Sequence, residues 1–343
     1  YYAVAALFTS PVSTEDLLEL ITPNPHAAIG LISPDGNANV VVHSDREAWP
    51  WQGATLAIHL SRFLSIALAT GTVLTVYLIS LTLWPDHGAF ALAAMAFVAF
   101  NPMFLYISAS VNNDNLMTLL AALVLWRLVA LVSGQITTSV WQFVTLGLLI
   151  GLATLAKFSG LGLMVLTGIT LLVWGGLQRN WRIAIGLNTL VAVLAITVGG
   201  WWYWRNHLLY GDWTGTNNMV TIMGARPVTP TFPQLVSELS SLARSFWGLF
   251  GYFSVPMPEP VYWLFNLILA AALIGWFLIA VQPHRSQLLP PRLAKTWPIL
   301  VGWALIMVAG FIYWTLRTPA TQGRLLFPAL AAIAPLWAVG WLA

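Results

Sequence analysis

The stretch that decides the fold is VWQFVTLGLLIGLATLAKFSGLGLMVLTGITLLVWGGL, residues 140–177, in which Lys157 is the only charged residue. A helix rises 1.5 Å per residue, so one helix through the whole stretch would be roughly 57 Å long, against a hydrocarbon core of roughly 30 Å. We therefore predict two membrane-crossing helices, at 140–156 and 158–177, with Lys157 at the tip of a helical hairpin. One kinked helix is the alternative, but it is too long for a single crossing.

The rest of the chain has the same apolar character. Of 343 residues, 59% are hydrophobic and only 7% are charged, and the mean hydropathy is +0.79. A soluble domain carries roughly 25% charged residues, so this composition excludes a soluble fold. Further apolar runs of membrane-spanning length lie at 54–83, 89–109, 115–133, 183–204, 261–282, 297–316 and 325–343. The sequence predicts an all-α polytopic membrane protein with about nine transmembrane helices.

These runs divide the chain into four parts. Residues 1–53, with six of the eleven acids, form a polar juxtamembrane segment, and residues 54–204 form the first six helices. Residues 205–260 form a long loop, in which Arg244 to Tyr252 is expected to be amphipathic or re-entrant. Residues 261–343 form the last three helices.

Alternating crossings place residues 1–53, 110–114, Lys157, 205–260 and 317–324 on one side of the membrane. The other side receives short connections that carry Arg179, Arg182, Arg285, Arg292 and Lys295. By the positive-inside rule this second side is cytoplasmic, so the first is extracytoplasmic. The net charge of +3 comes from few residues and does not indicate nucleic acid binding.

Residues 110–115, Ser-Val-Asn-Asn-Asp-Asn, form the most unusual polar cluster. One interpretation is a turn at Asn113 and Asp114 with Asp114 or Asn115 as the helix cap. The other is that Asn112, Asn113, Asp114 and Asn115 bind the hydroxyl groups of a sugar. Both remain open at this point.

Basic and amide residues recur at the predicted extracytoplasmic helix ends. They are Lys157, Arg205, Asn206, Arg317, Gln322 and Arg324. Such a group suits a lipid phosphate or diphosphate, because guanidinium groups match phosphate oxygens and stay charged. Interfacial anchoring of cations and an aromatic belt at Trp201 to Trp204 are the alternatives. The six histidines have no paired ligand spacing, so we assign no metal site and leave a divalent metal open.

The order of several short motifs resembles bacterial membrane glycosyltransferases of the GT-C superfamily, near the protein O-mannosyltransferase and aminoarabinose transferase (family 39-like) group. The motifs are Asp45-Arg46-Glu47-Ala48-Trp49-Pro50-Trp51-Gln52-Gly53, Phe100-Asn101-Pro102, Asn112-Asn113-Asp114-Asn115, Ala156-Lys157-Phe158, Trp202-Tyr203-Trp204-Arg205-Asn206, Tyr210-Gly211-Asp212, Phe246-Trp247-Gly248-Leu249-Phe250-Gly251 and Gln322-Gly323-Arg324-Leu325-Leu326-Phe327-Pro328.

This resemblance implies a GT-C-like fold in the bacterial plasma membrane. It implies transfer of a sugar, with inversion, from a polyprenyl-phosphate donor to an extracytoplasmic protein, lipid or glycan. In such enzymes a carboxylate in the first outer loop, just after the first transmembrane helix, acts as the base. That region would precede Tyr1, so the resemblance predicts an N-terminally truncated sequence without its base. Asp114, Asp45 and Glu47 are the secondary candidates.

Two other classes of function are compatible with the same residues. One is a transporter or flippase that moves a lipid-linked saccharide without making a bond. The other is a non-enzymatic scaffold in cell-envelope assembly. Membrane lipids are expected partners in each case.

Overall fold

The computed structural model describes residues 1–27, 30, 38–136, 138–251, 253–319 and 322–342, and these are mainly helical. Seven described helical segments are long and apolar enough to cross a membrane. They are α3 (Gly53–Leu83), α6 (Asn113–Val132), α8 (Gly160–Leu177), α9 (Trp181–Tyr210), α12 (Glu259–Val281), α13 (Leu293–Arg317) and the Gly323–Leu342 segment formed by η3 (Gly323–Ala329) and α14 (Leu330–Leu342). The chain therefore has the helices of an all-α polytopic membrane protein.

Two of the nine predicted runs are not among these seven segments. The run at 89–109 forms α4 (Gly88–Ala99) and α5 (Pro102–Ser108), which are bent by 65°. Counted as one span, this pair makes eight among the described residues. The run at 140–156 forms α7 (Val140–Ala156), which at 17 residues is shorter than the other candidates.

Asn101 and Pro102 explain the break between α4 and α5. Proline has no backbone N–H and disfavours a helical residue before it, so α4 ends before Pro102. The Asn101 side chain then accepts a hydrogen bond from the Phe104 N–H at 2.9 Å and caps the new helix, with Pro102 in its first turn.

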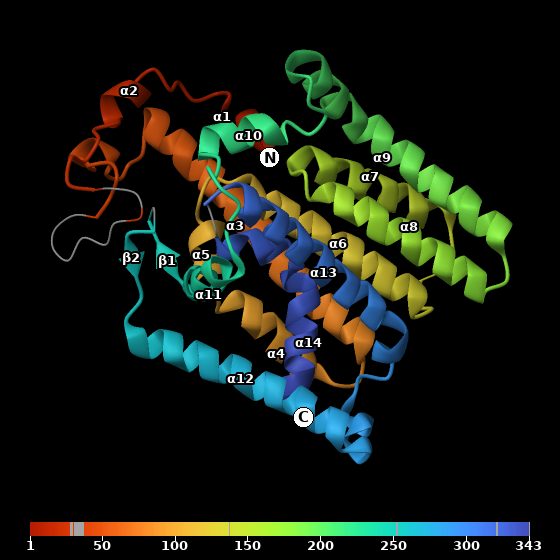
Figure 1. The fold of residues 1–343 in the computed structure, drawn as a ribbon. Coiled ribbons are helices and arrows are strands. Elements are labelled where there is room, and N and C mark those ends of the chain that lie inside the picture. Colours follow the sequence, from red (N-terminus) through yellow and green to blue (C-terminus); the bar gives the residue numbers. More distant parts are fainter. Residues whose placement is uncertain (28–29, 31–37, 137, 252, 320–321, 343) are drawn as a thin grey trace.

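The stretch around Lys157 folds as the predicted helical hairpin. α7 ends at Ala156, Lys157 is extended, and α8 begins at Gly160 (Figure 1). A Cβ atom on Gly160 would lie 2.4 Å from the Ala153 carbonyl carbon, so the tight turn requires glycine. On the neighbouring helix α9, a Cβ on Gly199 would lie 2.1 Å from the Thr154 hydroxyl oxygen. Small residues thus bring α7 and α9 into close contact, as in many membrane helix pairs.

α6 forms the centre of the bundle. Two thirds of its most apolar window, 67%, is buried within the protein, whereas α12 is only 11% buried. Figure 1 shows α12 along the margin of the molecule, beside α14. α13 is joined to the core by Trp303, which is fully buried and donates its indole N–H to the Pro328 carbonyl oxygen at 2.7 Å.

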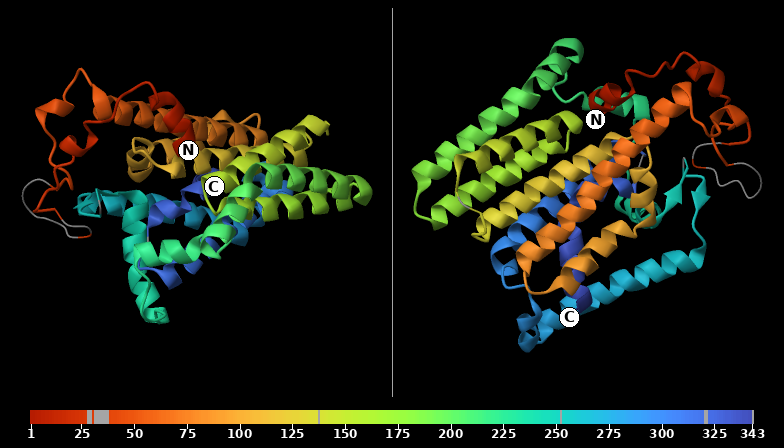
Figure 2. Two further views of the ribbon diagram at one scale, coloured as in Figure 1. Left: turned by 90° about the horizontal axis from the view of Figure 1, so that it is seen from above. Right: turned by 180° about the vertical axis from the view of Figure 1, so that it is seen from behind.

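Shorter elements gather at one end of the bundle, which we call the site end. α1 (Tyr2–Thr9), α2 (Leu17–Leu20) and α10 (Thr216–Met223) all lie at this end in Figure 1, and the view from above in Figure 2 shows α1 and α2 apart from α10. The 3-10 turn η1 (Asp45–Glu47) precedes α3. α11 (Phe232–Trp247) is followed by a hairpin of β1 (Leu249–Phe250) and β2 (Val255–Pro256).

The predicted loop at 205–260 begins later in the structure. α9 continues to Tyr210 and ends where Gly211 takes a left-handed conformation, with φ of 65°. The reason is that glycine adopts this helix-ending conformation without steric cost, whereas no residue at 205–209 stops a helix. Arg205 and Asn206 are therefore helical residues.

Candidate functional site

The asparagines at 112–115 build the turn between α5 and α6. Asn112 caps α6, because its side-chain oxygen accepts a hydrogen bond from the Asp114 N–H at 2.8 Å. The Asn115 amide donates to the carbonyl oxygens of Ile107 at 3.0 Å and Ser110 at 3.3 Å. The cap is thus Asn112, and the interpretation with Asp114 or Asn115 as the cap is wrong.

Asn113 joins this turn to the helical hairpin of α7 and α8. Its amide donates to the Ala156 carbonyl oxygen at 2.8 Å, at the last residue of α7. A helix end leaves such carbonyls without an intrahelical partner, so Asn113 satisfies one of them. Three of the four predicted sugar-binding residues therefore make internal contacts that position the fourth, Asp114.

Asp114 and Lys157 form an ion pair between α6 and the hairpin tip. The Lys157 ammonium group donates to the Asp114 carboxylate, with Nζ and Oδ1 2.5 Å apart. The Asp114 side chain is 7% exposed and that of Lys157 is 27% exposed. A buried charge of this kind requires a partner, and water reaches the pair from the lysine side.

Tyr2 and Arg324 belong to the same site. The pKa of the Tyr2 phenol is raised, first by partial burial and then by the negative charge of Asp114. A hydrogen bond from the backbone of Asn113 and the positive charge of Arg324 act in the opposite direction but do not outweigh these effects. The Asp114 carboxylate of the ion pair and the Arg324 guanidinium therefore both lie within electrostatic reach of the Tyr2 phenol. We call Tyr2, Asp114, Lys157 and Arg324 the charged cluster.

Arg324 is held by its neighbours in η3. The Gln322 side-chain oxygen accepts from Arg324 Nε at 2.7 Å, and within the described part of the chain the two terminal guanidinium nitrogens make no hydrogen bond, so they can contact a ligand. The Gly323 N–H donates to the Ser245 hydroxyl at 2.9 Å, and a Cβ on Gly323 would lie 2.3 Å from the Phe246 backbone nitrogen. α11 thus contacts η3 directly and fixes the segment that carries Arg324.

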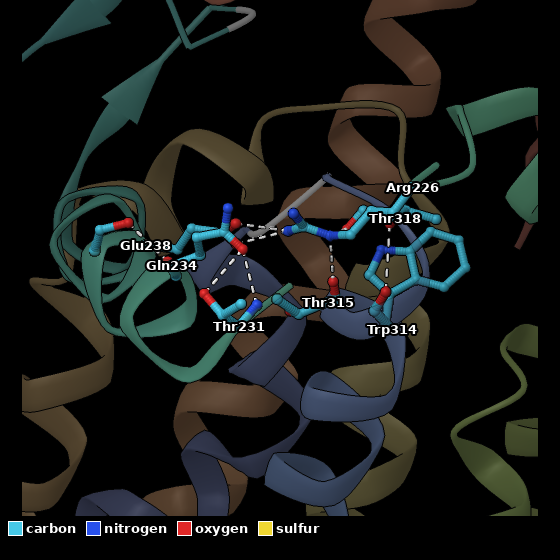
Figure 3. Close-up of polar contacts among 8 residues, drawn as sticks. Arg226, Thr231, Gln234, Glu238, Trp314, Thr315 and Thr318 are labelled. Atoms are coloured by element: carbon cyan, nitrogen blue, oxygen red, sulfur yellow. Dashed lines mark hydrogen bonds and ion pairs between the residues drawn. The ribbon is translucent and has the colours of Figure 1, made fainter. Parts of the chain in front are cut away.

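Arg226 attaches the loop after α10 to the end of α13 (Figure 3). Its Nε donates to the carbonyl oxygens of Thr315 at 2.7 Å and Thr318 at 3.1 Å, and its terminal nitrogen contacts both carboxylate oxygens of Glu238 at 2.7 and 2.8 Å. The guanidinium group therefore satisfies the last carbonyls of α13 and holds α11 beside them.

The predicted residues Arg205, Asn206 and Arg317 have different surroundings. Arg205 is exposed and stacks on the Trp202 ring, 5.1 Å from its centroid. Asn206 is buried, at 5% exposure. Arg317 donates to the Tyr313 hydroxyl at 2.6 Å and to the Asn217 side-chain oxygen at 2.7 Å.

A contact between α9 and α7 shows where Arg205 lies along the length of the bundle. The Tyr203 hydroxyl donates to the Thr154 carbonyl oxygen at 2.9 Å, one turn before Lys157. Because α7 and α9 are in close contact there, Arg205 lies at about the height of the hairpin tip. Its side chain makes no contact with the charged cluster among the interactions of the described residues.

Ion pairing separates six arginines of the site end into two groups. Arg46, Arg226 and Arg244 pair with Glu19, Glu238 and Glu259. Arg205, Arg317 and Arg324 have no carboxylate within ion-pair distance in the described part of the chain. The second group is the one whose positive charge remains for an anionic ligand.

Asp45 and Glu47 lie in η1, before α3. Asp45 is exposed. Burial opposes ionisation of Glu47, but hydrogen bonds from His43 and the Ser44 N–H outweigh it and lower the pKa of this carboxyl. Glu47 is thus the acidic member of a capping box, which is a structural role.

The segment that begins at Arg244 packs into the bundle through the aromatic ring of Trp247. The Trp247 ring is buried, stacks on Phe265 with centroids 4.8 Å apart and meets Phe97 edge-on at 5.9 Å. Most of α11 before Ser245 is exposed or half-buried. Of the segment predicted to be amphipathic or re-entrant, only Arg244 to Trp247 is helical, as the last turn of α11, and this turn is the inserted part; Leu249 and Phe250 form β1. Tyr252 lies outside the described residues.

Comparison with known proteins gave no matching family model, no similar curated protein and no similar solved structure. Within the described ranges, no group of three His, Asp or Glu side chains is arranged to hold a metal ion.

Sequence reasoning missed Tyr2, Ser245 and Arg226. Tyr2 has only its aromatic character as a signal, and Ser245 has none. Arg226 lies in the predicted extracytoplasmic loop at 205–260, but its role depends on Glu238 and on the backbone of α13, which no local pattern reveals. The charged cluster can bind a phosphate through Arg324 and polar groups through the free lone pairs of Asp114.

Proposed function

We propose that this protein is a membrane glycosyltransferase that moves a sugar from a polyprenyl-phosphate donor to an acceptor. The observation that carries the proposal is the charged cluster, at one end of a bundle of membrane-spanning helices: a buried carboxylate is paired with a lysine, and this carboxylate and the Arg324 guanidinium both act electrostatically on the Tyr2 phenol. Arg324 has no carboxylate within ion-pair distance among the described residues. A lipid-linked donor places its phosphate at this depth, between hydrocarbon and water.

In this proposal the cations stabilise the departing phosphate. Charge develops on its oxygens as the bond to the sugar breaks, and fixed guanidinium groups stabilise that charge without reorganisation. Arg324 is the primary group because Gln322 orients it. Arg205 and Arg317 extend the positive surface toward α9 and α10. Asp114 accepts hydrogen bonds from sugar hydroxyls, with Lys157 holding its carboxylate.

The site end is proposed to be the extracytoplasmic face of a bacterial plasma membrane. The support is the charge of the opposite connections, which carry Arg179, Arg182, Arg285, Arg292 and Lys295. The acceptor, whether protein, lipid or glycan, would approach from the aqueous side near α1 and α10.

The test is sugar transfer in membranes that contain the protein and a labelled polyprenyl-phosphate sugar. We expect Arg324→Gln to lower the rate about 100-fold or more, as removal of one transition-state donor does in other enzymes. The double variant Lys157→Ala with Arg205→Ala should also be strongly impaired. Arg46→Gln is the matched control, because Arg46 pairs with Glu19 on the exposed surface.

Wild-type rates in both variants would refute the assignment of these cations to the donor phosphate. For Arg324→Gln, expression and thermal stability must match the control; the double variant loses the Asp114–Lys157 pair, so its rate is measured at a temperature at which it remains folded and is normalised to the folded protein. Loss of activity in Arg46→Gln as well would indicate a general effect of charge on the membrane face.

A transporter or flippase is the second candidate, and the break between α4 and α5 favours it. Broken helices are typical of transporter binding sites, and the amide nitrogen of Asn101 at this break is buried without a hydrogen-bond partner in the described structure. Liposomes without any acceptor discriminate the two functions. A transporter would move a labelled lipid-linked saccharide across the bilayer, whereas a transferase would leave it in place.

A further inference from the structure

A large groove lies at the end of the bundle opposite the charged cluster. Its volume is about 680 Å³. Its walls come from α12, from the turn η2 (Pro283–Leu288), from the first part of α13 and from Leu336 in the middle of α14. The residues that define it are Trp276, Leu289, Pro290, Trp297, Val301 and Leu336. This volume falls within the roughly 300–1,000 Å³ that is usual for sites of small ligands.

The walls of the groove suit a hydrocarbon chain. Ser286 is the only polar side chain among the residues that line it. The Trp276 indole N–H is already used, since it donates to the Leu336 carbonyl oxygen at 2.8 Å. The ring therefore presents carbon atoms to the groove. Trp297 is half-exposed, at 50%, as is common for tryptophans at the level of lipid headgroups.

Two cations lie next to lining residues of this groove in the sequence. Arg285 and Lys295 are the direct neighbours of the lining residues Ser286 and Ala294, and Lys295 is exposed. From residue 260 to residue 343 the sequence contains no aspartate or glutamate. Arg292 points elsewhere, because it donates to the Thr82 carbonyl oxygen at the end of α3 at 2.9 Å.

Acidic groups at this end of the bundle are few. Asp86, in the turn between α3 and α4, is the only acid in the short connections on this side, and it forms no ion pair among the described residues. An apolar groove bordered by cations and without acids in its walls is complementary to an amphiphile with a negative headgroup.

We propose that the groove binds one anionic glycerophospholipid of the bilayer, with an acyl chain against Trp276, Trp297 and Leu336 and the phosphate beside Lys295 and Arg285. The site is distinct from the charged cluster and does not depend on sugar transfer. Its consequence is a protein whose α12 and α13 are joined through a bound lipid at this end.

Native mass spectrometry of the purified protein tests the site. The protein in mild detergent is incubated with phosphatidylglycerol or with phosphatidylcholine, and the lipid that survives detergent removal is counted. We expect preferential retention of phosphatidylglycerol, and about fivefold weaker retention in Lys295→Gln, since one surface lysine contributes roughly that factor. Val301→Phe, which fills the groove, should abolish retention.

Arg182→Gln is the matched control, because Arg182 is an exposed cation in the first turn of α9, outside the groove. It should retain phosphatidylglycerol as the wild type does. Equal retention of the two lipids by the wild type would overturn the proposal, and so would unchanged retention in both groove variants. Displacement by an equal concentration of polyprenyl phosphate would assign the groove to an isoprenoid chain instead. Lys295→Gln alters an exposed side chain, so it remains informative if Val301→Phe fails to fold.

Discussion

The ion pair of Asp114 and Lys157 gives the sharpest test of the site's physical description. Changing Lys157 to methionine removes the ammonium group and leaves the Asp114 carboxylate, which is only 7% exposed, without a charged partner. Breaking a fully buried pair in this way costs about 3–5 kcal/mol. Lys157 is 27% exposed, so water can replace part of its contribution. We therefore expect a loss of about 2–3 kcal/mol in the free energy of unfolding.

The reverse change should cost less. In Asp114→Asn the amide still accepts a hydrogen bond, and the flexible lysine can turn its ammonium group to water. We expect a loss of about 1 kcal/mol. The double variant should then be more stable than the sum of the single losses predicts, by about 1–2 kcal/mol, because neither charge is left unpaired.

The assay is reversible unfolding in mixed micelles, followed for the wild type, the two single variants and the double variant. Lys157→Arg is the control that keeps the charge. Strictly additive losses would mean that the two groups do not interact, and equal losses in the two single variants would contradict the assigned burial. Either result would refute the reasoning about the pair.

Three further predictions concern the loop, the helix contacts and pH. Arg226→Lys keeps the charge but loses the paired contact with both carboxylate oxygens of Glu238. We therefore expect about 2 kcal/mol less local stability and faster hydrogen exchange in α11. Unchanged exchange would exclude the role of Arg226 in holding α11 against α13. Gly275→Ala places a Cβ 1.7 Å from the Gly340 oxygen and should lower the thermal midpoint, whereas the control Gly310→Ala, with no atom within 4 Å, should not. Hydrogen bonds from the backbone N–H of Asn217, and then from Thr214, lower the pKa of Asp212 in the turn between α9 and α10. The contribution of the ionised Asp212 carboxylate to stability is therefore present above the unfolded pKa of about 3.9 and is lost as the pH falls through the folded pKa. Hydrogen exchange in α10 should accordingly become faster on acidification in the wild type but not in Asp212→Ala.

Much of the fold could be predicted from the sequence because the membrane acts on local composition. A run of about 20 apolar residues must form a helix, since no water is present to satisfy its backbone groups. This reasoning located the helical runs and the hairpin at Lys157. It did not predict the break between α4 and α5, because Asn101 and Pro102 start a new helix inside a run long enough to span the membrane. It also placed the end of α9 before Arg205, although no helix-ending residue occurs before Gly211.

The candidate site could be predicted only in part. The polar residues at 110–115 and at 322–324 were found because they interrupt apolar runs. Their individual roles were not, since a side-chain amide that binds a sugar and one that caps a helix have the same sequence signal. The structure shows that Asn112, Asn113 and Asn115 contact backbone groups, which leaves Asp114 as the residue with a charged partner.

The sequence by itself determined that this protein has membrane-spanning helices and where polar residues interrupt them, because both follow from the hydrophobicity of contiguous residues. Only the tertiary structure decided which charges are paired. Asp114 and Lys157 are 43 positions apart, and Arg226 contacts the carbonyl oxygen of Thr318 across 92 positions. Such contacts depend on how the helices pack, and that packing distinguishes an arginine held by a carboxylate from Arg324, whose terminal guanidinium nitrogens remain for a ligand.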